Sequence, residues 1–405
     1  MRLANCFVHS IYKGEWMTEA VTAITSKRNS ADAGTELGET LRRGMKGAAA
    51  DAIVVFASAQ HDFDTLLTTL SEAAGTRVIA GASSAGEFTH SSRGEGYVSA
   101  LGLRSASMQF AIGVGRGLKT GKPEHVADQV VSSFKGLDAR ALPYRSALVM
   151  ADALAGHADG IVEALTVATA GNYRFFGGGA GDDGRFQQTH VFAGTEAITD
   201  AVVALEILSA RPIGVGVSHG WVPAGPGLRV TEVQGTRLVS LNGAPAVEAF
   251  EEHARNTGQS FDAANPLPFF LHNIIGIESA GSYRLRVPLG VDEDGAVLCA
   301  ASVPSSSIVS IMKTSAASAV LAAEQATRAA LEALGGCPPG AALVFDCVAT
   351  RLRMGTAFDD ELKACANLLH PAGFVGCNTY GQIARSEGQF GGFHNCTAVV
   401  CVLPE

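Results

Sequence analysis

Apolar residues along the chain are grouped into short continuous runs, and amphipathic stretches separate these runs. The runs at residues 53–58, 147–152 and 342–347 lack a regular polar alternation, which is typical of strands covered on both faces of a sheet. In residues 228–233 and 282–288 polar and apolar side chains alternate, which predicts antiparallel strands with one exposed face.

The same order of elements occurs three times along the sequence. Each time an apolar strand leads to a helix, a second strand that breaks into glycine, and a closing apolar strand. The first two copies are followed by similar segments, AIGVG at 111–115 and PIGVG at 212–216. We therefore predict an α/β fold in which duplicated strand–helix–strand units form mixed sheets in two related parts, with a boundary near residues 235–241. The copies span residues 53–103, 147–208 and 342–403.

Composition and charge narrow the classes of function. Hydrophobic residues make up 47% of the 405 residues and charged residues 17%, which is enough apolar material for a large core. The formal net charge is −9, and there is no basic run. The chain therefore lacks the electrostatic footprint of a nucleic-acid-binding protein. Because no window of about 18 residues is apolar and uncharged, we expect no membrane span.

Cysteine usage and the N-terminus indicate a reducing compartment. The eight cysteines include no CxxC pair, so a zinc ribbon or a c-type haem attachment has no support. Residues 1–16 have no apolar segment before Lys13 and do not resemble a signal peptide. Buried free thiols are the default in a chain without a secretion signal, so we expect a cytoplasmic protein.

Six short segments stand in a characteristic order along the chain. They are DAIVVFAS at 51, VIAGASSAGE at 78, FFGGGAGDD at 175, LVSLNGAPAVEAF at 238, NTYGQIARSEG at 378 and FHNCTAVV at 393. This ordered set resembles the FIST family, a two-part sensory module of bacterial signalling proteins. The resemblance implies a FIST N-terminal-like domain at 1–238, a FIST C-terminal-like domain at 239–405, binding of small ligands, amino acids among them, and signalling to partner proteins. One branch of the family binds haem and senses nitric oxide beside a histidine kinase.

The chain departs from the commoner family pattern at Gln382, where a glutamate is usual. This difference puts in doubt any role that a carboxylate would have in the third copy.

The glycine-rich turns are the candidate ligand site. Glycine lets the chain turn sharply and brings backbone N–H groups to the open end of a sheet, where ligands of open α/β sheets bind. Hydroxyl and amide side chains there offer hydrogen bonds, and Glu87 or Asp182 offers a charge for an amine. The alternative is that the glycines only permit strands and helices to pack. The candidate residues are Gly81, Ser83, Ser84, Gly86, Glu87, Gly178, Asp182, Asn378, Thr379 and Tyr380.

Haem is the one cofactor that the resemblance suggests, and it needs an axial ligand. His219 follows an apolar strand and stands two residues before Trp221, so it is the first candidate ligand to the haem iron. His190 and His157 are the alternatives. A histidine that is satisfied within the fold, or simply exposed, is the competing interpretation for each.

Two enzymatic alternatives rest on single nucleophiles. Residues 82–86, ASSAG, resemble the G-x-S-x-G turn of serine hydrolases but have alanine in the first glycine position, and Cys377 is a candidate thiol nucleophile. Nucleotide-binding loops are excluded, because Gly121-Lys122 is followed by Pro123, where a phosphate-binding loop needs Ser or Thr.

The sequence therefore predicts a non-enzymatic sensory protein. A small molecule bound between the glycine turns of the two parts would favour one relative arrangement of these parts. A partner such as a histidine kinase would read that arrangement in trans, since we expect no kinase, cyclase or DNA-binding segment in the chain.

Overall fold

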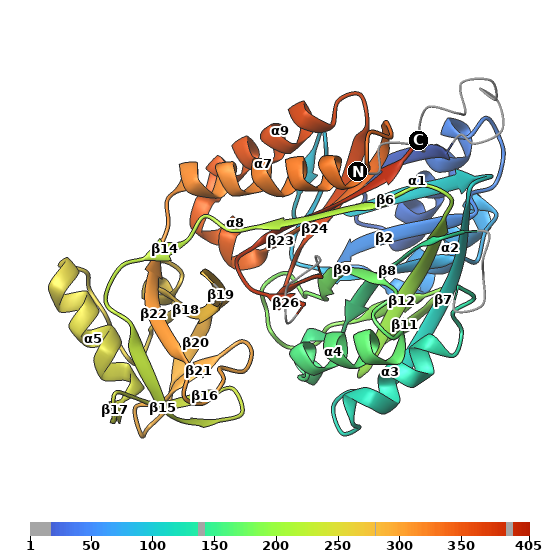
Figure 1. Cartoon of the computed structure of the whole chain (residues 1–405). Helices are drawn as coiled ribbons and strands as arrows, with labels where there is room; N and C mark the ends of the chain where they lie inside the picture. Colours follow the sequence, from blue (N-terminus) through green and yellow to red (C-terminus); the bar gives the residue numbers. More distant parts are fainter. Residues whose placement is uncertain (1–17, 137–141, 280, 386–391) are drawn as a thin grey trace.

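The computed structural model describes residues 18–136, 142–279, 281–385 and 392–405. Cys6 and the N-terminal stretch 1–16 lie outside these residues. Three six-stranded sheets form the body of the protein, and a fourth, antiparallel sheet projects from one side (Figure 1). The predicted α/β class, with mixed sheets built from repeated strand–helix–strand units, is confirmed.

The first unit forms around the parallel pair β2–β3, which α2 connects. The closing strand β6 pairs antiparallel with β2, and β1 pairs antiparallel with β6. Asp62 caps the N-terminus of α2 by accepting a hydrogen bond from the backbone of Thr65, and Gly75 ends the helix in the left-handed conformation. The elements are β1 (Thr18–Thr25), α1 (Ser30–Gly44), β2 (Ala52–Ser58), α2 (Phe63–Ala74), β3 (Ile79–Ser84), β4 (Glu87–Thr89), β5 (Arg93–Gly94) and β6 (Val98–Ser105).

The second unit repeats this order. Strands β8 and β9 are parallel, β12 pairs antiparallel with β8, and β7 pairs antiparallel with β12. Its elements are β7 (Met108–Arg116), α3 (Pro123–Val131), β8 (Tyr144–Ala151), the 3₁₀ turn η1 (Ala153–Ala155), α4 (Ala158–Ala168), β9 (Arg174–Gly179), β10 (Val191–Ala193), β11 (Glu196–Ile198) and β12 (Ala201–Ser209).

The third unit has the same order, with β23 parallel to β24 and antiparallel to β27. The fourth sheet is inserted between its first strand, β13, and the helix α7. Its elements are β13 (Gly214–Ser218), α7 (Ala316–Ala333), β23 (Pro339–Cys347), α8 (Val348–Met354), the 3₁₀ turn η2 (Gly355–Ala357), α9 (Phe358–Leu369), β24 (Gly373–Thr379), β25 (Gln382–Ala384), β26 (Phe393–His394) and β27 (Ala398–Pro404).

The inserted sheet contains the alternating strands that the sequence predicts, β15 and β19. The predicted domain boundary at 238/239 falls within β16 and stays a prediction. The inserted elements are β14 (Val222–Pro223), β15 (Leu228–Gln234), β16 (Arg237–Leu241), β17 (Ala244–Pro245), α5 (Ala246–Thr257), α6 (Leu267–Phe270), β18 (Ile274–Ser279), β19 (Ser282–Arg286), β20 (Pro288–Val291), β21 (Val297–Cys299) and β22 (Ile308–Lys313).

Each unit donates a short hairpin to the sheet of another unit. The β4–β5 hairpin of the first unit extends the sheet of the third, where β4 pairs with β24. The β10–β11 hairpin of the second unit pairs with β3 of the first, and the β25–β26 hairpin of the third pairs with β9 of the second. The exchange is therefore cyclic, so the three units form one body.

The similar segments at 111–115 and 212–216 do not end the units that they follow. The first lies in β7 and the second overlaps β13, and each is an outer strand of the next unit's sheet. The three predicted copies are present, but the second and third units each begin one strand earlier than predicted, at β7 and β13.

The inner faces of the three sheets share one core, and the helices lie outside it (Figure 1). Phe56 of the first sheet and Phe345 of the third sheet meet edge to face, with ring centroids 5.6 Å apart. Leu148 and Phe176 bring the second sheet into the same cluster. Strands of this body are apolar on both faces because one face meets this core and the other meets the unit's own helices.

The predicted strand-end glycines have a packing role in every unit. A Cβ on Gly81 would lie 1.7 Å from the carbonyl oxygen of Val55 on the neighbouring parallel strand. The equivalent contacts in the other two units, at Gly177 and Gly376, are each 2.1 Å. Since no side chain fits at these distances, glycine is required where the two central strands approach each other.

Candidate functional site

The three glycine-rich turns come together and interlock through backbone hydrogen bonds. The N–H of Ala85 donates to the carbonyl of Asn378 (2.9 Å), and the N–H of Gly181 donates to Ser83 (2.8 Å). The N–H of Tyr380 donates to Gly179 (3.0 Å), which completes the cycle. The predicted gathering of the turns is therefore present, and Ser83, Asn378 and Gly179 occupy equivalent positions in it.

Most of the predicted hydroxyl ligands are used within the turns. The N–H of His190 donates to Ser83 Oγ (2.9 Å), and Ser84 donates to Glu87 (2.5 Å). Thr379 donates to the carbonyl of Asp346 (3.3 Å) and accepts from Gln382 (2.9 Å). These side chains are buried, so they stabilise the turns rather than face a ligand.

Asp182 and Tyr380 contact each other beside the second turn. The Tyr380 hydroxyl donates to Asp182, which also accepts backbone hydrogen bonds from residues 186–188. Burial opposes ionisation of Asp182, but these donors together lower its pKa below the ordinary range. Phe186 stacks on the Tyr380 ring at 4.3 Å between centroids. This cluster holds the 182–188 loop in place.

Glu87 and Gln382 have the same structural role in two units. Glu87 accepts from Ser84 and from the N–H of Tyr97 (3.1 Å). Gln382 donates to Thr379 and accepts from the N–H of Thr397 (3.3 Å). Burial is the main cause that raises the pKa of Glu87 to about 8. Glu87 is therefore largely protonated at neutral pH, and the neutral amide of Gln382 has the same role in the third unit as this neutral carboxyl in the first.

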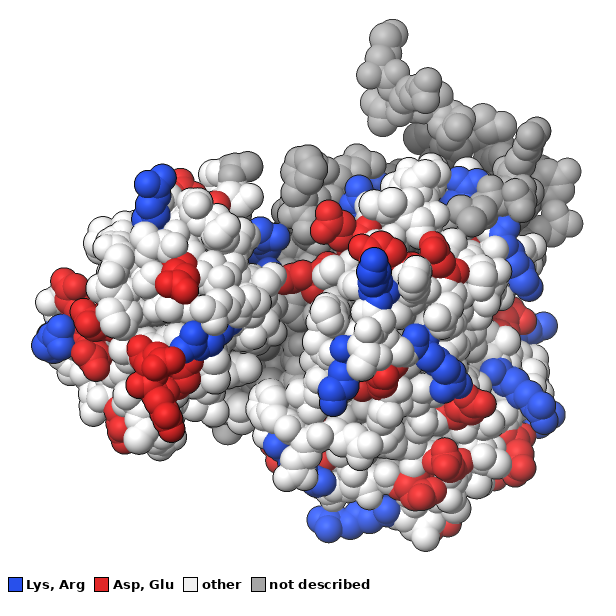
Figure 2. All heavy atoms as spheres, turned by 90° about the horizontal axis from the view of Figure 1, so that it is seen from below, with Lys and Arg blue, Asp and Glu red and all other residues white. Residues whose placement is uncertain are grey.

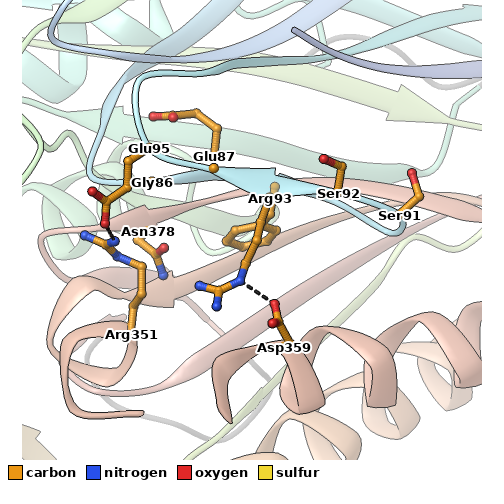
Figure 3. A pocket seen from close by; sticks show the side chains of 11 residues that line it. Gly86, Glu87, Ser91, Ser92, Arg93, Glu95, Arg351, Asp359 and Asn378 are labelled. Atoms are coloured by element: carbon orange, nitrogen blue, oxygen red, sulfur yellow. Dashed lines mark hydrogen bonds and ion pairs between the residues drawn. The ribbon is translucent and has the colours of Figure 1, made fainter. Parts of the chain in front are cut away.

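A cavity of about 450 Å³ adjoins two of the turns. It lies between the donated β4–β5 hairpin and the helices α8 and α9 of the third unit (Figure 3), and its size falls within the roughly 300–1,000 Å³ of small-molecule sites. Of the predicted ligand residues, Gly86, Glu87 and Asn378 line it. The complete lining consists of Gly86, Glu87, Phe88, Ser91, Ser92, Arg93, Gly94, Glu95, Arg351, Asp359 and Asn378.

Two ion pairs cross the cavity from hairpin to helix (Figure 3). Arg93 of β5 pairs with Asp359 in the first turn of α9, and Arg351 of α8 pairs with Glu95. The Arg351 side chain is 12% exposed, whereas that of Glu95 is 74% exposed. Such an exposed carboxylate adds little to stability, so an anion from outside can replace it on Arg351.

Asn378 is the polar group in the cavity that lacks partners. Its side chain lies between Arg351 and Arg93 (Figure 3), and the residue is 1% exposed. Among the residues that the structure describes, neither its Nδ2 nor its Oδ1 has a hydrogen-bond partner, and Arg351 Nε also has none. A buried amide without partners costs roughly 1–3 kcal/mol, so these atoms are positioned for a bound molecule.

The equivalent position in the first unit explains why the cavity is open at Asn378. There the longer loop between β9 and β10 fills the space, and His190 satisfies Ser83. In the third sheet the donated turn at 85–87 is short, so nothing in the described chain reaches the Asn378 side chain.

Sequence reasoning missed the charged residues of the cavity other than Glu87. Arg93 and Glu95 lie in the donated hairpin, and Arg351 lies in a helix that the pattern did not predict. Asp359 lies in the first turn of α9, where an acidic side chain is common for its interaction with the helix dipole. The one local signal was the polar stretch 91–95, SSRGE, between two predicted strands.

The residues around His219 do not fit a haem. Its Nδ1 accepts from the N–H of Trp221 (3.3 Å), and its Nε2 contacts the carbonyl of Tyr283 (2.9 Å). The adjoining cavity measures about 10 Å³, room for about one water molecule. His190 packs against Phe63 at 5.1 Å between centroids, and His157 is exposed before α4. Haem binding therefore stays a prediction of the resemblance.

The candidate nucleophiles are both fully buried. Ser84 donates to Glu87, and no histidine contacts it in the described part of the chain. Burial raises the pKa of the Cys377 thiol well above its ordinary value, so Cys377 is a weak nucleophile.

The surface charges and the helices bear on the predictions about nucleic-acid and membrane partners. On the face shown in Figure 2, basic side chains are interspersed with acidic ones, and a furrow separates the smaller lobe at the left from the body. Among the helices that the structure describes, none is both long and apolar enough to cross a bilayer.

Two family models match the chain in sequence. The FIST N domain matches residues 51–244, and the FIST C domain matches residues 246–385. Together they span most of the chain, including the turns and the cavity lining. No curated protein matches the chain.

Proposed function

Because the chain belongs to the FIST family, whose domains are sensory and bind small ligands in signalling proteins, we propose that it is a non-enzymatic sensor with its ligand in the cavity between the β4–β5 hairpin and α8. The observation that carries this proposal is the buried Asn378 amide, which has no hydrogen-bond partner in the described part of the chain. The predicted turns contribute Gly86, Glu87 and Asn378 to the site.

The charges of the cavity favour a zwitterionic ligand, such as a free amino acid. Arg351 and the Asn378 Nδ2 donate hydrogen bonds that suit a carboxylate. Asp359 and the Asn378 Oδ1 accept hydrogen bonds that suit an ammonium group. The two arginines balance Glu95 and Asp359, and the third acid, Glu87, has a pKa raised to about 8 by burial, so the cavity favours a ligand without net charge. Glu87 is not the counter-ion of the amine, because its carboxyl is bonded to Ser84 and Tyr97.

Helix α8 provides a path from the ligand to the inserted sheet. Arg351 faces the cavity, and Arg353, two residues later, lies over the ring of Trp221 at 5.4 Å from its centroid. Trp221 stands in the connector between β13 and the inserted sheet. A ligand that holds Arg351 therefore biases the position of the inserted sheet. A partner such as a histidine kinase reads this position in trans, in the cytoplasm, where the free thiols of the described chain stay reduced.

Calorimetric titration with the free amino acids tests the site. We expect Asn378→Ala to weaken binding by about 10- to 100-fold, because a hydrogen bond to a charged group contributes roughly 1.5–3 kcal/mol. Ser83→Ala is the matched control, since it changes the equivalent position of the first unit, and it should leave affinity unchanged. Equal affinity of Asn378→Ala and the unchanged chain would refute this location.

Tryptophan fluorescence tests the path through α8. The chain has two tryptophans, so Trp16→Phe leaves Trp221 as the only emitter. We expect an amino acid that binds to shift its emission, and Arg353→Met to abolish the shift while binding persists. A shift that survives in Arg353→Met would contradict this path.

A further inference from the structure

The inserted sheet contacts two units of the body near the end of β19. This strand lies next to β26 (Figure 1), and successive side chains of a strand point to opposite faces. Leu285 and Val287 are buried in one apolar cluster with Trp221, beside the third unit. Arg286, which lies between them in sequence, contacts α4 of the second unit instead. The end of β19 is therefore held between the second and third units.

Arg286 is fully enclosed at this contact. Its side chain is 1% exposed. Within the inserted part of the chain, its guanidinium donates to the carbonyls of Ser302 and Leu285, both at 2.8 Å. Toward the body it donates to the carbonyl of Phe393 in β26 (3.5 Å) and to the carboxylate of Asp159 (2.9 Å). Asp159, in the first turn of α4, supplies the negative charge that pairs this buried cation.

Both carboxylate oxygens of Asp159 accept hydrogen bonds from the inserted part of the chain. Arg286 donates to one oxygen, and the Ser302 hydroxyl donates to the other (2.8 Å). The next residue in the contact, Ala301, packs into the apolar cluster of the second unit together with Ile161 of α4. The Asp159 side chain is 29% exposed, so water reaches the acidic side of the contact. A single carboxylate therefore joins the inserted sheet to the second unit at a place that solvent can enter.

We propose that Asp159 and Arg286 form a latch that holds the inserted sheet on the second unit and that must open before this sheet changes its position. In the closed state Arg286 is paired and shielded from water, and Leu285 and Val287 cover Trp221. In the open state water hydrates both charges, and the sheet stays joined to the body through the segments that enter and leave it. A half-open arrangement is costly, because it leaves the Arg286 charge buried without a counter-ion. The latch therefore has two discrete states.

Acrylamide quenching of Trp221 fluorescence tests the latch. In Trp16→Phe, Trp221 is the only emitter, and it is 5% exposed in the closed state. In this background we expect Asp159→Asn to raise the quenching constant at least about twofold, because a buried charge without its partner favours the open, hydrated state. Asp292→Asn is the matched control, since Asp292 pairs with Arg237 inside the inserted sheet, and it should leave quenching unchanged. Equal quenching in Asp159→Asn and Asp292→Asn would overturn the proposal.

Arg286→Met removes the dependence on one variant. It deletes the contact with Asp159 but leaves no unpaired charge in the interior, so we expect it to fold even where Asp159→Asn does not. Its quenching should also exceed that of Asp292→Asn, and quenching no higher than this control would contradict the latch. Since no amino acid is added, the result does not depend on the proposed ligand cavity. If calorimetry finds no ligand while both latch variants loosen the sheet, only the proposed function fails.

Amide hydrogen exchange separates opening of the latch from general unfolding. In Asp159→Asn and Arg286→Met we expect faster exchange in β19 and in the segments next to the inserted sheet, while the amides of β2 exchange as in the unchanged chain. Equally accelerated exchange in β19 and β2 would mean that the whole fold is weakened, and it would overturn the proposal.

Discussion

Replacing Glu87 with glutamine is expected to remove a large part of the pH dependence of folding. The third unit already uses Gln382 in the equivalent position, with the same pair of hydrogen-bond partners. The glutamine side chain reproduces the shape of a protonated glutamic acid and can donate to Ser84 as Gln382 donates to Thr379. Glu87→Gln therefore preserves the fold while it removes one titration.

The sign and size follow from the pKa of Glu87, which folding raises from 4.5 to about 8. The folded chain binds this proton more tightly than the unfolded chain, so the stability from Glu87 is complete below pH 4.5 and is lost as the pH rises through 8. At 1.36 kcal/mol per pKa unit, the loss between pH 5 and pH 8 is roughly 3 kcal/mol. The charge of Asp183 nearby also raises this pKa.

Urea denaturation at pH 5 and pH 8 measures the effect. We expect the free energy of unfolding to fall between these values by about 3 kcal/mol more in the unchanged chain than in Glu87→Gln. Gln382→Glu is the reverse control, and it should gain a dependence of the same sign because its site is equally buried. An identical pH profile of Glu87→Gln and the unchanged chain would refute the reasoning.

Three further predictions concern the cavity, the close approach of β2 and β3 at Gly81, and His219. Glu95→Gln removes the carboxylate that competes for Arg351, so a bound amino acid should bind up to about fivefold more tightly in calorimetry. Gly81→Ala places a Cβ against the carbonyl of Val55 and should destabilise folding by about 3 kcal/mol in urea titrations. His219→Ala should leave the absorption spectrum of the chain after haem addition unchanged, because both ring nitrogens already have partners; a Soret band lost in this variant would restore the haem hypothesis.

The sequence predicts those parts of the fold that depend on local patterns. Helix α2 follows the first apolar strand, as the repeat predicts, and its ends are set by local signals, the cap at Asp62 and the terminal Gly75. Local patterns do not show where each unit begins, because its first strand, β7 or β13, pairs with a strand much later in the sequence. The sequence also brought Asn378 into the candidate site, but it missed Arg93 and Arg351. These arginines line one cavity only because a hairpin of one unit enters the sheet of another.

The hairpin exchange has a consequence for sensing. One wall of the ligand cavity comes from the first unit and the other from the third, so a ligand between them stabilises the junction of these units against opening. A ligand that binds only the closed junction raises the free energy of unfolding by RT ln(1 + [L]/Kd), about 2.7 kcal/mol at a hundredfold excess over Kd. Because the same α8 carries Arg351 at this junction and Arg353 over Trp221, the proposed sensor would couple closing of the junction to the position of the inserted sheet. Under the proposed function, this coupling would let a small molecule alter a part of the surface that a partner contacts.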